Sequence, residues 1–359
     1  MRVLVTLPEP KKQGGVVSYW QALLPRLDGL ADSFTVGARV EESGLLRRML
    51  RFLKDYASYY RVLWSQPYDV VHLNPSLTRD ALIREGILLL IAKVFGKRVL
   101  VFLHGWDAEC ELSIRRWFLF LFRSVYFKAD TFIVLSTRFR SVLEELGYDE
   151  QIYVETTVVP DDVFQRPEIK NSRRRLTHDD VNILFLARVE RAKGVFISID
   201  AFRRVKDTYP SVTMTIAGDG SDLDKAAKYV KSQGIPDVQF RGWLGSEAKH
   251  KVFADADIYL LPTLWGEGCP CSVLEAMSHG LPVVARPVGG LADFLEDGQT
   301  GFLSRSQDPH VFAELLCRLI RKSELRREIG THNRKYAADH FRASQMAHRL
   351  ERIYASLVG

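Results

Sequence analysis

Short apolar runs alternate with longer stretches of helical spacing along the whole chain. Runs rich in valine, isoleucine and leucine, without polar alternation, are typical of strands buried on both faces, as in parallel sheets. The runs of the first half are Arg2–Leu7, Val70–Leu73, Arg98–Leu103, Thr131–Leu135 and Ile152–Val159. Those of the second half are Asn182–Ala187, Thr213–Ala217, Val238–Arg241, Ile258–Leu261 and Pro282–Ala285. The alternation predicts doubly wound α/β units in both halves.

A segment of different character separates the halves. Residues 160–180 contain prolines, Asn171-Ser172 and three consecutive arginines, with little apolar periodicity, so they predict a linker. A chain of 359 residues fits two domains, which we place at 1–165 and 178–341. A last helix, at about 342–359, carries an apolar stripe that must pack against another element: Met346, Leu350, Ile353, Tyr354 and Leu357.

Composition narrows the class of protein. With 47% hydrophobic and 26% charged residues, the chain is globular rather than disordered or collagen-like. Its first apolar run is too short for a signal peptide, and no run reaches the roughly 18–20 residues of a membrane span. The four cysteines lack framework spacing and are typical of reduced thiols in a cytosolic protein. Cys269 and Cys271 have no further ligands near them in the sequence, so we predict no metal site.

The most informative segment is Leu264–Gly280, which follows an apolar strand and leads into a helix at about Ser272–Ser278. A loop that delivers free backbone N–H groups and the positive end of a helix dipole to a sheet edge suits a phosphate. Glu267 lies at the start of this loop and Glu275 one turn inside the helix, where carboxylates could accept sugar hydroxyls. The alternative is an ordinary strand–helix loop with Glu275 on a solvated face.

Other strand ends of the same half carry compatible residues. Arg188 and Lys193 follow the first strand of this half, and two cations there could neutralise a diphosphate, although surface charge is the simpler alternative. Glycine turns containing Gly218 and Gly242 follow the next two strands. One ligand-binding edge explains these features together more simply than separate coincidences do.

These residues resemble the retaining family 4 glycosyltransferases of the GT-B fold, over nearly the whole chain. Glu267 through Glu275 has the family's E-x7-E spacing, and Arg188 with Lys193 is similar to its Arg/Lys pair. Residues 288–291 and 296–303 resemble its downstream segments. The resemblance implies two Rossmann-like domains that face an interdomain cleft, with the N-terminal domain choosing the acceptor, the C-terminal domain binding the donor, and the C-terminal helix crossing back to the N-terminal domain.

The resemblance also implies roles for individual residues. Arg188 and Lys193 would stabilise the departing nucleoside diphosphate, Glu267 would contact the transferred sugar, and His104 would lie near the reacting carbon. Glu275 would hold the ribose diol, and the turn at Gly242 would meet the base. The implied donor-binding residues are Gly14, Gly15, Gly218, Gly242, Trp243, Leu244, Gly268, Cys269, Pro270, Cys271, Ser272, Val273, Leu274 and Glu275. Without the family, His104 would be interpreted as a hydrogen-bonded histidine at a strand end.

The implied reaction needs no metal and no cofactor, with a UDP- or GDP-sugar as donor. The one literal Asp-x-Asp, Asp255-x-Asp257, lies at a predicted helix-to-strand junction rather than a strand end. The chain departs from the family at Pro160–Phe164, which reads Pro-Asp-Asp-Val-Phe where the family often has Pro-Asn-Gly-Val-Asp.

The acceptor half is basic and aromatic. Residues 45–128 hold 14 Lys/Arg against 7 Asp/Glu, and Arg47–Lys54 and Arg115–Arg123 mix cations with apolar residues. Interfacial helices combine these residue types, because apolar side chains enter the acyl boundary while cations meet anionic lipid. This predicts a cytoplasmic enzyme, peripheral on the inner face of the membrane, whose acceptor is a lipid-linked or growing surface-polysaccharide glycan. The alternative for Trp117–Phe122 is a buried core helix.

Other function classes fit less well. A sugar-nucleotide-binding protein without transfer activity, or a GT-B enzyme of another reaction type such as an epimerase, remains the alternative. A dinucleotide-dependent oxidoreductase would need G-x-G-x-x-G after the first strand, where this chain has Pro8–Gly15 without that pattern. Nucleic-acid binding would rest on charge alone, so we predict none.

Overall fold

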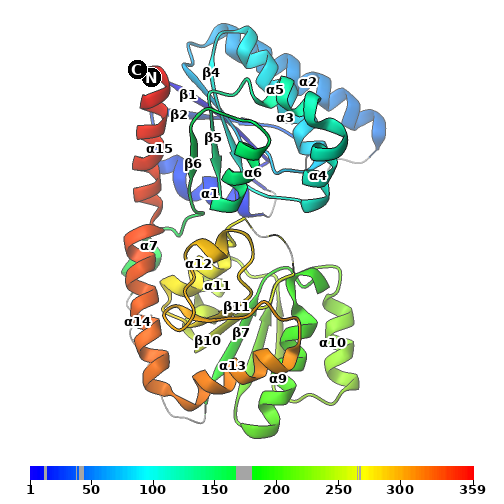
Figure 1. Ribbon diagram of the computed structural model, residues 1–359, viewed down its shortest axis with the longest axis vertical. Coiled ribbons are helices and arrows are strands. Elements are labelled where there is room, and N and C mark those ends of the chain that lie inside the picture. The colour runs from blue at the N-terminus through cyan, green and yellow to red at the C-terminus, as the bar shows by residue number, and fades with distance from the viewer. Residues whose placement is uncertain (12–13, 38, 40–43, 167–179, 265, 267) are drawn as a thin grey trace. The chain divides into compact units, whose positions relative to one another are not determined.

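The computed structural model describes residues 1–11, 14–37, 39, 44–166, 180–264, 266 and 268–359. The chain forms two compact units (Figure 1). Unit 1 comprises Met1–Val158 together with Ala343–Gly359, and unit 2 comprises Val159–Arg342. The last helix therefore belongs to the N-terminal unit, as the fold prediction requires.

Unit 1 is built on a six-stranded parallel sheet with the order β2-β1-β3-β4-β5-β6. Its strands are β1 Val3–Leu7, β2 Ala31–Thr35, β3 Val70–Leu73, β4 Arg98–Leu103, β5 Thr131–Val134 and β6 Ile152–Val154. Its helices are α1 Gly15–Leu23, η1 Leu24–Arg26, α2 Leu45–Ser65, α3 Arg79–Val94, α4 Ala108–Ser113, the π-helical η2 Ile114–Phe118, α5 Leu119–Tyr126, α6 Thr137–Glu145 and α15 Ala343–Val358.

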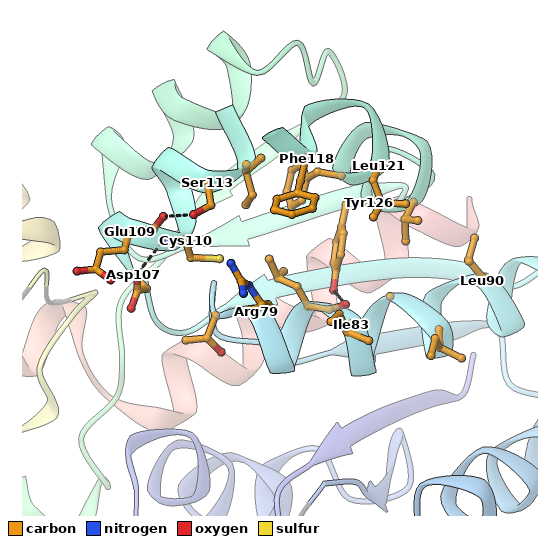
Figure 2. Close-up of a pocket in the computed structure, with 17 residues that line it drawn as sticks. Arg79, Ile83, Leu90, Asp107, Glu109, Cys110, Ser113, Phe118, Leu121 and Tyr126 are labelled. Carbon is orange, nitrogen blue, oxygen red and sulfur yellow. Dashed lines mark hydrogen bonds between the residues drawn. The ribbon is translucent and has the colours of Figure 1, made fainter. Parts of the chain in front are cut away.

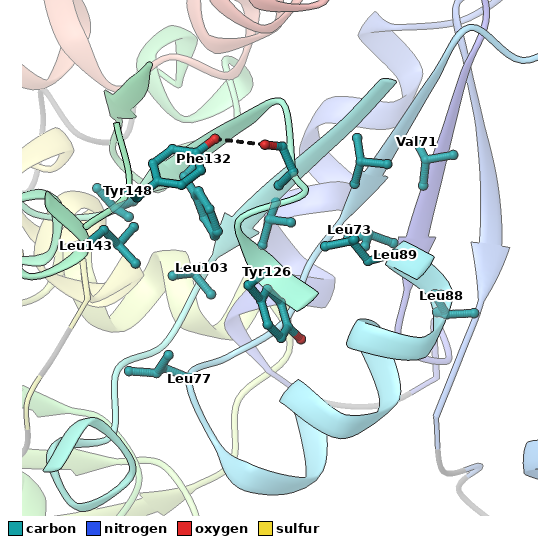
Figure 3. Packing of buried hydrophobic residues seen from close by; sticks show 14 of the residues in the cluster. Val71, Leu73, Leu77, Leu88, Leu89, Leu103, Tyr126, Phe132, Leu143 and Tyr148 are labelled. Atoms are coloured by element: carbon teal, nitrogen blue, oxygen red, sulfur yellow. Dashed lines mark hydrogen bonds between the residues drawn. The ribbon is translucent and has the colours of Figure 1, made fainter. Parts of the chain in front are cut away.

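The connections of unit 1 divide its helices between the two faces of the sheet. The chain moves one way from β1 to β2 and the opposite way at every later step, so right-handed crossovers place α1 on one face and α2, α3, α5 and α6 on the other. Side chains of the strands and helices form a continuous apolar core, part of which Figure 3 shows around Leu73, Leu103 and Phe132.

The C-terminal helix α15 packs beside α1 and β3. The predicted apolar stripe is buried at Met346, Leu350, Ile353 and Tyr354. The Tyr354 hydroxyl lies 2.7 Å from Nδ1 of the fully buried His72 on β3, so one polar contact fixes the register of the helix on the sheet.

Unit 2 has a second six-stranded parallel sheet, with the order β12-β11-β10-β7-β8-β9. Its strands are β7 Asn182–Leu186, β8 Thr213–Ala217, β9 Val238–Gly242, β10 Ile258–Leu261, β11 Val283–Ala285 and β12 Gly301–Leu303. Its helices are α7 Asp162–Gln165, η4 Arg191–Lys193, α9 Val195–Thr208, α10 Leu223–Ser232, α11 Ser246–Ala254, α12 Cys271–Ser278, η5 Gly289–Asp293, α13 Pro309–Arg321 and α14 Ser323–His340.

Both sheets are doubly wound, and each reverses its strand order once. The reversal lies between β1 and β3 in unit 1 and between β7 and β10 in unit 2. Ligands of open α/β sheets bind beyond the carboxyl ends of the strands at such a switch point. The topology therefore singles out one edge of each sheet before any side chain is considered.

Most predicted strands agree with the structure to within a residue at each end. The predicted strand Ile152–Val159 is wrong at its end, since β6 stops at Val154. Two strands, β2 and β12, were not predicted; both are edge strands, and the half-exposed sequence of β2 lacks an apolar run. Of the predicted linker, residues 167–179 lie outside the described part, and α7 already belongs to unit 2.

Candidate active site

At the carboxyl edge of the unit 2 sheet, the backbone of neighbouring loops packs closely together. Gly218, after β8, has φ +127°, and a Cβ there would lie 1.9 Å from the carbonyl oxygen of Ala187. Gly220 faces Val189 in the same way, with its Cβ position 2.5 Å from that carbonyl oxygen. The amide of Gly218 in turn donates to the carbonyl of Gly242 at 2.7 Å. The loops after β7, β8 and β9 therefore pack directly against one another, and only glycine can be accommodated at positions 218 and 220.

Lys193 lies in a turn that is held against the neighbouring strand β10. It ends η4 and is 8% exposed. The next residue, Gly194, has φ +83°, and a Cβ there would lie 2.4 Å from the carbonyl oxygen of Pro262. The amide of Leu264 donates to the carbonyl of Ala192 at 2.8 Å. Lys193 is thus positioned by backbone contacts at the switch point between β7 and β10.

Arg188 differs from Lys193 in its surroundings. Its side chain is 59% exposed, and Nη1 donates to Oε1 of Glu190 at 2.8 Å. An exposed ion pair of this kind contributes little to stability and exchanges partners readily. The guanidinium can therefore leave Glu190 for an anion of higher charge at the same edge.

Helix α12 begins at the same switch point. It starts at Cys271 after Pro270, which supplies no side-chain cap, and its first turn contains no acidic residue. The positive end of the helix dipole is therefore not neutralised by the helix itself, which favours an anion there. Behind the turn, the Tyr259 hydroxyl lies 2.9 Å from the carbonyl oxygen of Leu186 and 2.7 Å from Oγ of Ser272, and so ties the end of β7 to the start of α12.

The loop before α12 is partly described. Gly268 is buried, and its carbonyl accepts from the amide of Gly290 at 2.7 Å, which connects the loop to η5. Cys269 is also buried, whereas Pro270, Cys271 and Ser272 are half-buried. Glu267, predicted to contact the transferred sugar, lies outside the described residues.

Glu275 is buried and paired with a lysine that the sequence did not suggest. Nζ of Lys249, on α11, lies 2.5 Å from Oε1 of Glu275. Burial raises the pKa of Glu275 above its usual value, and the positive charge of Lys249 opposes that rise. The interpretation of Glu275 as a solvated surface residue is therefore wrong. Val273 and Leu274 are fully buried beside it, so of these three residues Glu275 is the one with polar chemistry.

The turn after β9 is open. Gly242 has φ +60° with nothing within 4 Å of a Cβ position. Trp243 is 57% exposed and Leu244 is half-buried. An exposed aromatic ring beside a left-handed glycine leaves main-chain groups and a flat apolar surface available to a ligand.

In unit 1, His104 follows β4 and stacks on Phe102 with ring centroids 3.9 Å apart. Burial lowers its pKa to about 3, so the imidazole is neutral at physiological pH. Its Nε2 lies 2.8 Å from Oδ1 of Asn74, which also accepts from the indole N–H of Trp20 at 3.0 Å.

These contacts assign the tautomer of His104. An indole N–H only donates, so the Asn74 atom that it faces must be the amide oxygen. Nε2 of His104 faces the same oxygen and therefore carries the proton. The second nitrogen, Nδ1, keeps its lone pair and can accept a hydrogen bond from a hydroxyl group.

The glycine loop of unit 1 lies at the start of α1. Gly14 is the N-cap with φ +154° and no atom within 4 Å of a Cβ position, and Gly15 is exposed. The amide of Ser18 donates to the Gly14 carbonyl at 3.0 Å. Gly14 and Gly15 therefore open α1 at the end of unit 1 to which β1 points.

The structure thus brings together most of the predicted residues of unit 2, at one sheet edge: Arg188, Lys193, Gly218, Gly242 and the start of α12. Gly14, Gly15 and His104 lie in unit 1. Sequence reasoning missed Lys249, Tyr259, Asn74 and Trp20. Tyr259 gave a weak signal, as a polar aromatic residue inside an apolar strand; the other contacts join residues far apart in the chain.

The outward surfaces of α2 and the η2–α5 segment are apolar and cationic. On α2, Met49, Leu53 and Trp64 are exposed, and Trp117 and Phe120 are 70% and 86% exposed. The interpretation of Trp117–Phe122 as a buried core helix is therefore wrong for most of the run; within it, Phe122 is buried. The π-helical turn at Ile114–Phe118 is part of this surface, and such turns are frequent at functional sites.

No helix in the described part of the chain is long and apolar enough to cross a membrane. Within the same residues, no three His, Cys, Asp or Glu side chains converge as a metal site would require.

Comparisons with known proteins agree with this architecture. Residues 3–160 match the model for the glycosyl transferase 4-like domain, and residues 167–336 match the model for glycosyl transferases group 1. The chain is 34% identical over 161 residues to the amylovoran biosynthesis glycosyltransferase AmsK of Erwinia amylovora, an alignment that covers 43% of this chain and 39% of that protein. It is 28% identical over 188 residues to the phosphatidyl-myo-inositol mannosyltransferase of Mycobacterium leprae, covering 51% and 49%. Both alignments span less than half of these relatives.

Among solved structures, Anabaena Alr3699/HepE in complex with UDP-glucose has a similar fold, with a TM-score of 0.75 and 18% identity over 99% of this chain and 100% of that one. Two doubly wound units, a C-terminal helix that returns to the first unit, and family matches in both halves define the class of GT-B glycosyltransferases. The chain belongs to that class, with a 4-like domain in its N-terminal half and a group 1 domain in its C-terminal half.

Proposed function

We propose that the protein is a retaining glycosyltransferase that moves a sugar from a nucleoside-diphosphate sugar to a glycan acceptor. The observation that carries the proposal is the edge of unit 2 at the β7/β10 switch point. This edge combines three features: backbone loops whose close approach requires glycine, the buried Lys193, and the start of α12, which has no side-chain cap. A diphosphate fits a site with a fixed cation, free N–H groups at a helix start and backbone that a ligand can approach closely.

Each residue then takes a defined role. Lys193 and Arg188 neutralise the diphosphate and stabilise the charge that grows on it as it leaves. Glu275, which is paired with Lys249, accepts hydrogen bonds from the two hydroxyls of the ribose. The Gly242–Leu244 turn receives the base, and Glu267 contacts the transferred sugar. His104, neutral and protonated on Nε2, accepts a hydrogen bond from a sugar hydroxyl at Nδ1 rather than acting as a base.

In the reaction, the bond from the anomeric carbon to the diphosphate breaks and a bond to the acceptor oxygen forms on the same face of the sugar. The acceptor proton passes to the departing diphosphate. Protein cations and helix N–H groups provide the charge stabilisation that a divalent metal provides in other phosphate-transfer sites, so the reaction is expected to be metal-independent. UDP is the first nucleotide to test, because the structural relative HepE is complexed with UDP-glucose.

We further propose that the acceptor is a lipid-linked or growing surface-polysaccharide glycan, reached at the inner face of the cytoplasmic membrane. Two relatives point in this direction, since one is an amylovoran biosynthesis glycosyltransferase and the other a phosphatidyl-myo-inositol mannosyltransferase. The exposed apolar and aromatic residues of α2 and of η2–α5, with Lys54, Arg61 and Arg116 beside them, have the composition of an interfacial surface.

The decisive experiment measures thermal stabilisation by UDP, GDP, ADP and NAD, each with and without EDTA. A ligand at 100 times its Kd adds roughly 2.7 kcal/mol of stability, which shifts the Tm of a chain of this size by a few degrees. We expect one nucleoside diphosphate to stabilise the protein, EDTA to have no effect, and Lys193→Gln to abolish the shift. The matched control is Lys231→Gln, at an exposed lysine of α10 in the same unit.

If no nucleoside diphosphate stabilises the protein, or if Lys193→Gln and Lys231→Gln behave alike, the donor site is misassigned. Membrane binding is tested separately by sedimentation with vesicles of neutral and anionic lipid. Binding that does not increase with anionic lipid content would contradict the interfacial surface.

A further inference from the structure

A cavity of about 730 Å³ lies within unit 1, between α3 and the segment from α4 to α5. This volume falls in the range of small-molecule sites in proteins, roughly 300–1,000 Å³. Most of its lining is apolar and comes from the facing sides of α3 and η2–α5: Leu82, Ile87, Leu90, Phe118, Leu121 and Val125. The donor-site assignment uses none of these residues.

The cavity is polar at one end (Figure 2). Arg79, Asp107 and Glu109 lie there, whereas Leu90, Leu121 and Tyr126 line the other end. Arg79 is the first residue of α3 and the one cationic side chain among the described residues that line the cavity, whereas the carboxylate of Asp107 is held as the N-cap of α4 and accepts from the amide of Cys110 at 2.8 Å. The cavity therefore has the polarity of an amphiphile, with one polar end and a long apolar body.

The polar end is physically connected to His104. The amide of Leu77 donates to the carbonyl of Gly105 at 2.8 Å, and the amide of Asp107 donates to the carbonyl of Leu77 at 3.3 Å. The loop that carries His104 and the loop that leads to Arg79 are thus one hydrogen-bonded piece. A molecule held in the cavity would place its polar end on the same sheet edge as His104.

We propose that this cavity binds the hydrocarbon chain of a lipid-linked phosphate acceptor, with the chain between α3 and α5 and the phosphate at Arg79. The inference rests on the proposed function, because it gives the lipid acceptor its binding site. Phe118 and Leu121 both line the cavity and belong to the exposed apolar surface, so the cavity is continuous with that surface and a chain can enter from a membrane.

A second copy of the protein is a poorer occupant. A two-fold interface sets the same patch against itself, so the exposed cations Arg116, Arg123 and Lys128 of both copies would be brought together around one interface. The same cations attract an anionic lipid surface.

The test titrates the whole protein with dodecyl phosphate below its critical micelle concentration, by calorimetry. Inorganic phosphate and lysophosphatidylcholine with a 12-carbon chain serve as comparison ligands. We expect one dodecyl phosphate per chain, with inorganic phosphate and the zwitterionic lipid at least tenfold weaker. Ile87→Trp, which fills the cavity, and Arg79→Gln should each weaken dodecyl phosphate binding at least tenfold.

Val94→Trp is the matched control. It places the same side chain on the same helix, two turns further on, at a position that is 83% exposed and does not line the cavity. Its binding should equal that of the wild type. Circular dichroism and the nucleotide-induced Tm shift report whether Ile87→Trp is folded, and Leu121→Trp fills the cavity from the opposite helix if it is not.

The inference is overturned if the wild type, Ile87→Trp and Leu121→Trp bind dodecyl phosphate with equal affinity. It is also overturned if lysophosphatidylcholine binds the wild type as tightly as dodecyl phosphate does, or if the protein is a dimer in the presence of dodecyl phosphate. If dodecyl phosphate binds as expected but no nucleotide does, the lipid site stands and the donor assignment fails. If a nucleotide binds but dodecyl phosphate does not, the cavity assignment fails alone.

Discussion

The carboxyl edges of the two sheets are built from different parts of the polypeptide. In unit 2, the edge is mainly backbone, because Gly194, Gly218 and Gly220 let neighbouring loops approach to distances at which a Cβ would collide. In unit 1, the edge is mainly side chains, since Trp20, Asn74 and His104 form a hydrogen-bonded chain around a stacked imidazole.

The difference separates two ways of holding a ligand. A backbone edge presents N–H groups and fixed turns, which suits the constant part of a donor, its diphosphate. A side-chain edge, with a cavity beside it, can change its chemistry by substitution without disturbing the sheet. Under the proposed function, the backbone edge of unit 2 holds the diphosphate of the donor, and the side-chain edge of unit 1 lies beside the cavity proposed for the acceptor.

The largest effect is expected from breaking the backbone edge. In Gly218→Ala, the new Cβ would meet the Ala187 carbonyl oxygen, and the φ of +127° disfavours any side chain, so we expect a loss of roughly 3–5 kcal/mol in the free energy of unfolding. Gly234→Ala is the control, because it has positive φ with open space around it and should lose only about 1 kcal/mol. Urea denaturation of both variants measures the difference, and equal losses would mean that the close approach at Gly218 contributes nothing.

A smaller loss of stability is expected at the Lys249–Glu275 ion pair, an interaction of unit 2 that depends on side chains. Lys249→Met leaves a buried carboxylate without its cation, and we expect a loss of about 3 kcal/mol at pH 7. In a Glu275→Gln background the same substitution should lose less than about 1 kcal/mol, because no charge is then stranded. A double-mutant cycle in urea gives both values, and losses that simply add would show that the two side chains are not coupled.

Much of the contrast between the two edges is visible in the sequence. Glycines directly after apolar strands predict where backbone loops lie close together. Asp308-Pro309 has the pattern of an N-cap followed by proline at the first helical position, and the Asp308 carboxylate accepts from the amide of His310 where α13 starts. The apolar stripe of α15 was likewise predicted from its spacing. Such signals are local, because one residue type at one position decides the backbone geometry.

The side-chain edge was not predictable in this way. Asn74 contacts Trp20 and His104 across 54 and 30 residues of sequence, and nothing in any of the three segments indicates the others. Nothing in the sequence around Lys249 distinguishes it from other lysines with helical spacing, and its ion pair with Glu275 depends on the fold. The cavity beside α3 likewise depends on how two helices pack, which apolar spacing does not specify.

The next prediction changes the side-chain edge directly. Asn74→Asp preserves an oxygen opposite Nε2 of His104 but adds a negative charge, which stabilises the imidazolium. We expect the pKa of His104 to rise from about 3 by roughly two units, equivalent to about 2.7 kcal/mol. Titration by NMR of the His104 ring protons measures it, with Asn74→Leu as the uncharged control. An unchanged pKa in Asn74→Asp would refute the assigned hydrogen bond.

The smallest effect concerns acid stability at the end of α12, where His279 lies. Burial, aided by the neighbouring His250, Arg334 and Lys249, lowers its pKa to about 4, and Nδ1 lies 2.7 Å from the Glu275 carbonyl oxygen. Since an unfolded histidine has a pKa near 6.5, the unfolded chain binds the extra proton first, and stability falls as the pH drops below that value. Between pH 7 and pH 5, His279 alone should remove up to about 2 kcal/mol.

His279→Asn keeps a donor for the Glu275 carbonyl but cannot titrate, so its unfolding free energy should change less between these two pH values than that of the wild type. Urea midpoints at pH 7 and pH 5 test this, with the other buried histidines common to both proteins. An identical pH dependence in the variant would mean that His279 is not the group that titrates. A difference of about 2 kcal/mol would show that unit 2 depends on a neutral imidazole at the C-terminal end of α12 for its stability in acid.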